Sequence, residues 1–203
     1  MTKPTLYGVS ISRALRSIWA IEEVGIDYDH VPTHFFKDTK TPEFLSINPN
    51  GRVPTLVDGE LMLCESMAIN LYLAERYGDG LWPESIEDRA RTQQWSVWGI
   101  SEIEPLQMKI VIQKLFTKEE HRDEDAINES AKGLGRPLAV LDAHLANQSY
   151  LLGDRFTIAD LNVSGVMLLF QMIEFDVSAY PNVTRWTDDC YARPSLAAAR
   201  ARD

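Results

Sequence analysis

The stretch Asn50-Gly51-Arg52-Val53-Pro54-Thr55-Leu56, followed by Glu65-Ser66 at the head of an apolar helical run, indicates the fold of this chain. Proline has no N–H to donate in a β-ladder, so Pro54 fits the beginning of a strand. A Val53-Pro54 step there is suited to a cis peptide bond, which costs only about 0.5–1 kcal/mol relative to trans. A cis bend would turn the Val53 N–H and C=O outward, free to pair with the backbone of an extended ligand. The far end of a short peptide bound in this way would reach Glu65 and Ser66, which predicts a site for a small peptide-like molecule.

The composition is that of an ordinary globular protein. The 203 residues, 45% apolar and 25% charged, allow one large domain or two small ones. The formal net charge is −10 and neither half is basic, which disfavours nucleic-acid binding. No apolar run is long enough to cross a membrane, and the first residues lack the apolar core of a signal peptide. We therefore expect a soluble, cytoplasmic protein with no nucleic-acid and no membrane partner.

The cysteines and histidines do not form a recognisable reactive or metal-binding pattern. The two cysteines, Cys64 and Cys190, are far apart, which excludes a disulfide framework and a C-x-x-C redox centre. Cys64 is close to Glu65, but a free cysteine in a strand is usually a small apolar filler. The four histidines are scattered and lack metal-ligand spacing, so we expect no metal.

Two halves of the chain follow different patterns. Residues 1–79 alternate short strand-like runs with helices, and residues 85–203 carry long runs of helical periodicity with almost no strand signal. In the first half we expect strands near 5–9, 28–31, 53–57 and 61–63 and helices at 14–24 and 66–77. In the second half we expect helices near 85–116, 123–147, 157–174, 181–192 and 194–201. Pro105 should bend or divide the first of these, and Thr157–Asp160 forms a capping box that serves folding.

The loop between the first strand and the first helix carries Ser12 at a helix N-cap position. Its structural role is to satisfy an amide that the helix leaves unpaired. In a functional role, the hydroxyl would donate a hydrogen bond to a bound thiolate beside the positive end of the helix dipole. Lowering a thiol pKa by about two units needs roughly 2.7 kcal/mol, which one hydroxyl, the dipole and Arg13 or Arg16 together can supply. Arg16 fits a structural ion pair equally well.

The beginning of the second helix favours an α-amino acid head. Ile69 stands three residues after Ser66, so a capping box does not occupy the first-turn amides. Such a helix start can bind a carboxylate, and Glu65 beside it can pair with an ammonium.

These motifs resemble those of the glutathione S-transferases, in the serine-type branch with the theta, phi and zeta classes and in a bacterial type of chain. The resemblance covers nearly the whole sequence and includes Ser-x-x-x-Arg at 12–16, Phe-Leu-Ser-Ile-Asn-Pro at 44–49, Gly-Arg-Val-Pro at 51–54, Glu-Ser at 65–66 and the later Thr-x-x-Asp box. Each motif is moderately specific, and their order and spacing make the set strongly so.

The resemblance implies an α/β domain plus an all-α domain. Residues 1–79 would form a thioredoxin-like glutathione-binding domain of order β-α-β-α-β-β-α. Residues 85–203 would form an all-helical domain that contributes the electrophile pocket. It also implies a cytoplasmic homodimer with glutathione as cosubstrate and a role in detoxification.

The resemblance assigns roles to seven residues. Ser12 would be the catalytic hydroxyl, and the other six would bind glutathione: Val53 and Pro54 at its cysteinyl backbone, Glu65 and Ser66 at its γ-glutamyl head, and Lys40 and Arg52 near its glycyl carboxylate. The thiolate role is open between Ser12, Ser10 and Tyr7, and we favour Ser12 because Tyr7 fits a packed core position.

Two classes of function fit these residues. The first is a transferase that activates the glutathione thiol for attack on a small, largely apolar electrophile, with isomerase, peroxidase or dehalogenase chemistry as variants of the same site. The second is a non-catalytic relative that serves as a binding or scaffolding protein. Retention of both the Val53-Pro54 step and Glu65-Ser66 favours the first, because a scaffold has no need to hold a peptide.

Overall fold

The computed structural model of the protein describes residues 3–203. Internal contacts group the chain into two compact units, one of Met1–Trp82 with Ala192–Asp203 and the other of Pro83–Tyr191. This division differs from the domain bounds predicted above, 1–79 and 85–203, because the last residues pack with the first unit. Leu196 and Ala199, both buried, provide the apolar face of that packing.

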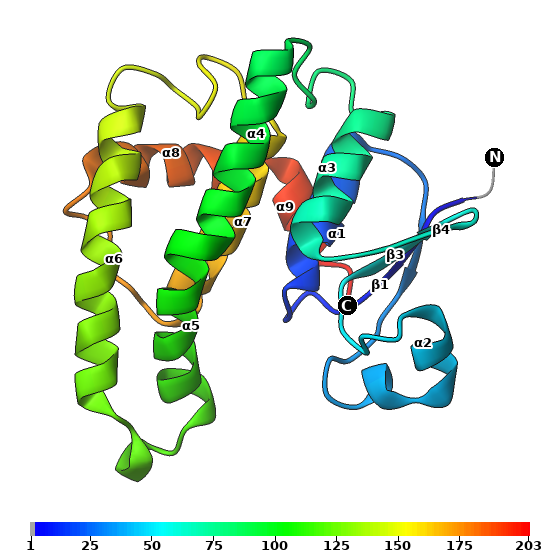
Figure 1. The fold of residues 1–203 in the computed structure, drawn as a ribbon, viewed down its shortest axis with the longest axis horizontal. Helices are drawn as coiled ribbons and strands as arrows, with labels where there is room; N and C mark the ends of the chain where they lie inside the picture. The colour runs from blue at the N-terminus through cyan, green and yellow to red at the C-terminus, as the bar shows by residue number, and fades with distance from the viewer. Residues whose placement is uncertain (1–2) are drawn as a thin grey trace. The chain divides into compact units, whose positions relative to one another are not determined.

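The first unit contains a mixed four-stranded sheet in the order β2-β1-β3-β4 (Figure 1). β1 runs parallel to β2 and antiparallel to β3, and β3 pairs with β4 as a hairpin. The thioredoxin-like order β-α-β-α-β-β-α is therefore confirmed. Its elements are β1 (Thr5–Tyr7), α1 (Ala14–Val24), β2 (Asp29–Val31), a 3-10 turn (Asp38–Lys40), α2 (Pro42–Ile47), β3 (Thr55–Asp58), β4 (Leu61–Cys64) and α3 (Ser66–Tyr77), with α9 (Pro194–Arg200) added from the end of the chain.

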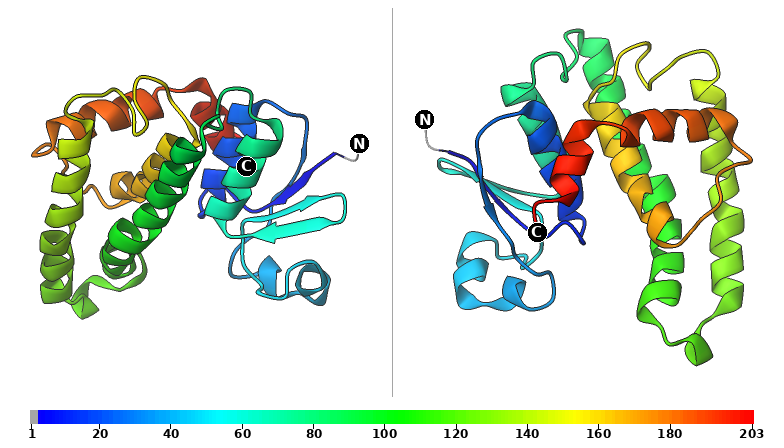
Figure 2. Two further views of the ribbon diagram at one scale, coloured as in Figure 1. Left: turned by 45° about the horizontal axis from the view of Figure 1, so that its top comes forward. Right: turned by 180° about the vertical axis from the view of Figure 1, so that it is seen from behind.

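Helices cover both faces of this sheet. α1, α3 and α9 lie together on one face, and α2 lies on the other (Figures 1 and 2). Leu6 and Leu56 of the sheet are almost completely buried, as are Ile18 of α1 and Ile69 of α3. Burial of a side chain of this size contributes about 1.5–3 kcal/mol, so this layer holds the sheet in place. The predicted bounds of α1 and α3 are confirmed to the residue.

Polar contacts fix α9 against α1. Arg193 donates to Glu23 through Nε at 2.9 Å and also through its terminal nitrogen. Ser195 donates to the same carboxylate and accepts a bond of 3.0 Å from the indole N–H of Trp19. Burial raises the pKa of Glu23, but the bonds from Arg193 and Ser195 outweigh it and leave the pKa below its ordinary value. A paired, half-buried carboxylate of this kind stabilises the contact when it is ionised.

The second unit is helical throughout its named elements. These are α4 (Ile86–Trp98), a π-helical turn (Gly99–Ile103), α5 (Glu104–Val111), a second π-helical turn (Ile112–Phe116), a 3-10 turn (Glu119–His121), α6 (Glu124–Leu145), α7 (Ile158–Met172) and α8 (Pro181–Tyr191). The bend or division expected at Pro105 is not a break in the chain: helical backbone continues from α4 to the second π turn, and the first π turn ends two residues before Pro105. Among the residues described, none of the helices is long and apolar enough to cross a membrane.

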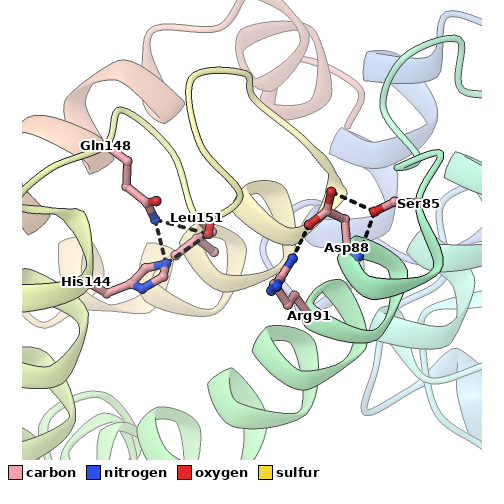
Figure 3. A network of polar contacts seen from close by, with 6 residues as sticks. All are labelled: Ser85, Asp88, Arg91, His144, Gln148 and Leu151. Carbon is pink, nitrogen blue, oxygen red and sulfur yellow. Dashed lines mark hydrogen bonds and ion pairs between the residues drawn. The ribbon is translucent and has the colours of Figure 1, made fainter.

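Two local networks fix the ends of these helices (Figure 3). At the start of α4, the Ser85 hydroxyl accepts from the Asp88 N–H at 3.0 Å, and the Asp88 carboxylate pairs with Arg91 at 2.6 Å. At the end of α6, the His144 ring lies 2.8 Å from the Leu151 carbonyl through Nε2. Both contacts are short-range and serve the fold.

The capping box at the start of α7 is confirmed and is more extensive than the sequence indicates. Asp160 is fully buried and accepts bonds from the backbone N–H and hydroxyl of Thr157, from the Leu151 N–H and from the Trp186 indole. Burial raises the pKa of Asp160 even though these bonds oppose the shift. The residue therefore holds α7, α8 and the preceding loop together.

Candidate glutathione site

Val53 and Pro54 lie where the chain enters β3, and the peptide bond between them is cis as predicted. Pro54 is buried and Val53 is half-buried. Within the described part of the chain, no hydrogen bond reaches the N–H or the C=O of Val53. Two backbone groups at the end of a sheet are therefore available to an extended ligand, which is how β-strand addition works.

Asn48, which sequence reasoning did not single out, organises the loop before Val53. Its side chain is fully buried and donates to the Arg52 carbonyl at 3.0 Å and to the Thr55 hydroxyl at 2.9 Å. Its side-chain oxygen accepts from the Asn50 N–H at 3.0 Å. The sequence signal was an Asn-Pro-Asn-Gly turn directly after a helix, where a side-chain amide can replace lost backbone partners.

Glu65 and Ser66 are brought to the same end of the sheet as Val53. The β3–β4 ladder ends at the pair Thr55 and Cys64, so Val53 and Ser66, each two residues further on, leave the sheet together. Glu65 is exposed and has a φ of 72°, which is unusual for a residue with a side chain and marks functional sites in many proteins. No side chain of residues 3–203 caps the first turn of α3. Its amides are therefore available to donate to a carboxylate, and that role for the helix start stays a prediction.

Gly8, at the start of the serine loop, lies close to both Val53 and Ala14. A Cβ built on Gly8 would be 3.5 Å from the Cβ of Val53 and only 2.3 Å from that of Ala14. The φ angle of Gly8 is 146°. Glycine is thus required for α1 to begin directly behind β1. The expected strand 5–9 ends at Tyr7 for this reason, since Gly8 turns the chain out of the sheet. This close approach places Ser12 at the N-terminal end of α1.

α1 begins at Ala14 with Arg13 as its N-cap, so Ser12 lies one residue before the predicted N-cap position, although its hydroxyl still contacts the start of the helix. The Ser12 hydroxyl donates to the Val9 carbonyl at 2.8 Å and accepts from the Ala14 N–H at 3.1 Å. A hydroxyl has one proton, so donation to a thiolate requires rotation away from Val9. An ionised sulfur is a stronger acceptor than a neutral carbonyl, which favours that exchange.

The two alternatives to Ser12 differ in their surroundings. Ser10 is half-buried, and its backbone N–H donates to both carboxylate oxygens of Asp203, at 2.9 and 3.0 Å. Tyr7 is also half-buried and packs edge-on against Phe44, with ring centroids 5.9 Å apart. The expected packed position for Tyr7 is therefore present in part, and the choice among the three residues stays a prediction.

The two arginines near Ser12 differ in exposure. Arg13 is exposed at the N-cap of α1, and Arg16 is only 3% exposed. The Arg16 carbonyl accepts a bond of 3.3 Å from the Asn70 amide of α3, which joins the two helices. Burial of this degree favours the structural role for Arg16 over contact with a thiolate.

Lys40 and Arg52 are both exposed and lie beside the Val53 loop. Lys40 donates to the Gly51 carbonyl through Nζ at 2.8 Å, so its ammonium group lies beside the residue that precedes Arg52. The role of Lys40 and Arg52 at a glycyl carboxylate stays a prediction.

Metal-ligand and thiol chemistry have little support near this loop. Within residues 3–203 no group of three or more His, Cys, Asp or Glu side chains has the geometry of a metal site. Cys64 is half-buried in β4 and accepts a long contact of 3.5 Å from the Asn50 amide. The low reactivity that we expect of Cys64 and the lack of a metal cofactor stay predictions.

Comparison with known proteins decides the family. The family model described as "Glutathione S-transferase, N-terminal domain" matches residues 3–75, and the model for the C-terminal domain matches residues 103–194. The chain belongs to the glutathione S-transferase family. Glutathione S-transferase 3 of Zea mays is 34% identical over 201 residues, covering 94% of this chain and 90% of its own. Glutathione S-transferase GstB of Escherichia coli K12 is 32% identical over 197 residues, covering 95% of each chain.

Solved glutathione S-transferase structures share the whole fold. The theta class enzyme of Xanthomonas axonopodis pv. citri, solved with glutathione bound, has a TM-score of 0.91 at 30% identity and covers 100% of this chain and 99% of its own. A glutathione S-transferase-I bound with lactoylglutathione has a TM-score of 0.88 at 33% identity, covering 98% and 99%. The predicted family and its fold are thus confirmed.

Proposed function

We propose that this glutathione S-transferase family member binds glutathione along Val53 and activates its thiol for attack on a small, largely apolar electrophile. The observation that carries the proposal is the backbone of Val53, which makes no hydrogen bond within the described residues and leaves the sheet at the same end as the uncapped start of α3. Gly8, which precedes the Ser12 loop, lies close to Val53. Glutathione has a cysteinyl N–H and C=O in its middle, a carboxylate at each end and a thiol. This set of groups matches the set of partners that the first unit offers.

Each end of glutathione has a candidate partner. The γ-glutamyl head carries an ammonium, which suits Glu65, and a carboxylate, which suits Ser66 and the first-turn amides of α3. The glycyl carboxylate suits the exposed cations of Lys40 and Arg52. With both ends held, the cysteinyl unit pairs with Val53, and its sulfur is directed to the serine loop.

Catalysis then depends mainly on thiolate formation. Thiolate is the nucleophilic form, and a free thiol has a pKa of about 8.5. A hydrogen bond from Ser12 Oγ, together with the N-terminal end of α1, favours the ionised sulfur. Holding the thiolate next to a bound electrophile supplies the orientation term of the rate enhancement. We propose that the helical domain provides the electrophile pocket and that the reaction is a substitution or an addition.

We further propose that the protein acts in detoxification as a cytoplasmic homodimer. The family resemblance supports this assembly. In addition, β4 lies at the sheet edge and leaves Leu61 and Met62 exposed at 39% and 36% of their surface. Apolar side chains on an edge strand are typical of a surface that a partner covers.

Substitution of Ser12 tests this mechanism. A hydrogen bond to a charged group contributes about 1.5–3 kcal/mol, so Ser12→Ala should lower kcat at neutral pH by about 10- to 100-fold. Glutathione affinity, measured by calorimetry, should change less than threefold, because Ser12 does not hold either end of the peptide. The ultraviolet absorbance of bound thiolate should titrate at a higher pH in the variant. Ser46→Ala, which changes an exposed serine of α2, is the matched control.

The same experiment separates the alternatives. If Ser10→Ala or Tyr7→Phe raised the thiolate pKa and Ser12→Ala did not, the catalytic hydroxyl would be reassigned. The bond from Ser12 to Val9 favours one competing function, a family member that binds glutathione without activating it. Retention on immobilised glutathione with an unshifted thiol pKa and no turnover across a panel of electrophiles would establish that function. No retention and no effect of glutathione on Tm would contradict both.

A further inference from the structure

The carboxylate of Asp203 binds the loop that carries Ser12. Both of its oxygens accept from the Ser10 N–H, at 2.9 and 3.0 Å, across a separation of 193 residues. Residues 10 and 203 belong to the same compact unit, so this contact is internal to the first unit. A carboxylate, which is charged, accepts a stronger hydrogen bond from a backbone N–H than a neutral oxygen does.

Side-chain contacts hold Arg202, the residue before Asp203, against α1 and Tyr28. The guanidinium of Arg202 contacts the Glu22 carboxylate of α1 at 2.6 Å and lies 4.8 Å from the centre of the Tyr28 ring. Tyr28 in turn donates its hydroxyl to the same Glu22 at 2.7 Å. The residue next to Asp203 is therefore fixed to α1, and Asp203 reaches the loop that precedes this helix.

The loop itself has few other restraints at this point. The Ser12 N–H donates to the Val9 carbonyl at 3.0 Å, which closes a turn over Val9–Ser12. Ser10 is the second residue of that turn, and in the described chain its amide has no acceptor other than Asp203. The Ser12–Val9 bond and the Ser10–Asp203 bond together restrain this turn and so hold the Ser12 hydroxyl in place.

We propose that Asp203 is a positioning residue for the thiolate-stabilising serine. It acts through Ser10 and the Val9–Ser12 turn and touches neither glutathione nor the electrophile. This inference rests on the proposed function, because it concerns how the serine loop of that site is held. Without the carboxylate, the loop samples several positions and Ser12 meets the sulfur less often, while the peptide contacts at Val53 and Glu65 are unaffected.

Two substitutions test the proposal. Asp203→Ala removes the acceptor, whereas Asp203→Asn keeps an oxygen that can accept from Ser10 and removes only the charge. Displacement of a catalytic group by about 1 Å can cost up to 10²-fold, so we expect Asp203→Ala to lower kcat by about tenfold with KM for glutathione changed less than twofold. Asp203→Asn should restore most of the loss. Asp189→Ala, at an exposed position of α8, is the control for removal of a surface carboxylate.

Hydrogen exchange at the Ser10 amide tests the role of Asp203 without a measurement of turnover. Hydrogen exchange at the Ser10 amide, followed by nuclear magnetic resonance without glutathione, should be slow in the wild type and in Asp203→Asn and at least tenfold faster in Asp203→Ala. Unchanged exchange and unchanged kcat in Asp203→Ala would overturn the inference, as would equal losses of kcat in the Ala and Asn variants. If the wild type formed no thiolate while exchange behaved as expected, the proposed function would fail and the contact would stand.

Discussion

Replacement of Asn48 by alanine probes the loop on which glutathione binding is proposed to depend. The side chain is fully buried and makes three hydrogen bonds, to the Arg52 carbonyl, the Thr55 hydroxyl and the Asn50 N–H. Each contributes about 0.5–1.5 kcal/mol net, and a buried partner left unpaired costs about 1–3 kcal/mol. Thr55 also donates to the Arg52 carbonyl at 3.0 Å, so that carbonyl keeps one partner. We expect a loss of about 2–4 kcal/mol in the free energy of unfolding of the first unit.

Urea and thermal unfolding measure this loss. In a chain of this size, 1 kcal/mol shifts Tm by about 2–4 °C, so Asn48→Ala should lower Tm by about 4–16 °C. Asn50→Ala is the matched control, because Asn50 is exposed and, within residues 3–203, its side-chain amide makes only the 3.5 Å contact with Cys64. Its backbone N–H, which donates to Asn48, is kept in the variant. That control should stay within about 0.5 kcal/mol of the wild type.

The same variant should bind glutathione more weakly. The Arg52 carbonyl precedes Val53 directly, so a loosened loop must be reordered when the peptide pairs with Val53. The stabilisation of Asn48→Ala by saturating glutathione should therefore be smaller than that of the wild type. If Asn48→Ala matched Asn50→Ala both in Tm and in its response to glutathione, the role assigned to Asn48 would be refuted.

Two further predictions concern backbone geometry and pH. Gly8→Ala should reduce kcat and Tm strongly, because the new Cβ would lie 2.3 Å from that of Ala14. Gly153→Ala is the control and should have the smaller effect, because Gly153 has a comparable positive φ but no atom within 4 Å of the added Cβ. Equal effects of the two substitutions in activity and melting assays would contradict this prediction. The pKa of Glu23 is held below its ordinary value of 4.5, so its contribution to stability should be present above that pH and lost in more acidic solution. The difference in stability between the wild type and Glu23→Gln should accordingly shrink below about pH 4.5, and a difference that grew in acid would be inconsistent with the Glu23–Arg193 contact.

Local signals in the sequence were sufficient for the elements that border the site. α1 and α3 begin and end as predicted, because their apolar periodicity and their terminal glycines act within one or two turns of chain. The cis bond before Pro54 and the capping box at Asp160 also follow from residues within a few positions of each other. The residues of α2 show no such local pattern, and only the family resemblance predicted a helix there.

Contacts between segments far apart in the chain could not be predicted from local sequence patterns. The sequence offers no sign that residues 192–203 return to α1, because the matching of Glu23 with Arg193 and Ser195 depends on the tertiary path. The bond from Ser10 to Asp203 was missed for the same reason. The partners of the Ser12 hydroxyl depend on how Gly8 turns the chain out of β1, which a motif cannot specify.

The proposed glutathione contacts rely heavily on backbone groups, and this affects how substitutions should be interpreted. The Val53 amide and carbonyl and the first-turn amides of α3 are present whatever side chains stand there, so truncating Val53 or Ser66 alone need not abolish binding. Their positions depend instead on residues that shape the chain, chiefly Gly8 and Asn48. Ser12 is different, because its hydroxyl acts directly on the sulfur. Substitutions at Gly8 and Asn48 should therefore impair binding and turnover together, whereas Ser12→Ala should separate them.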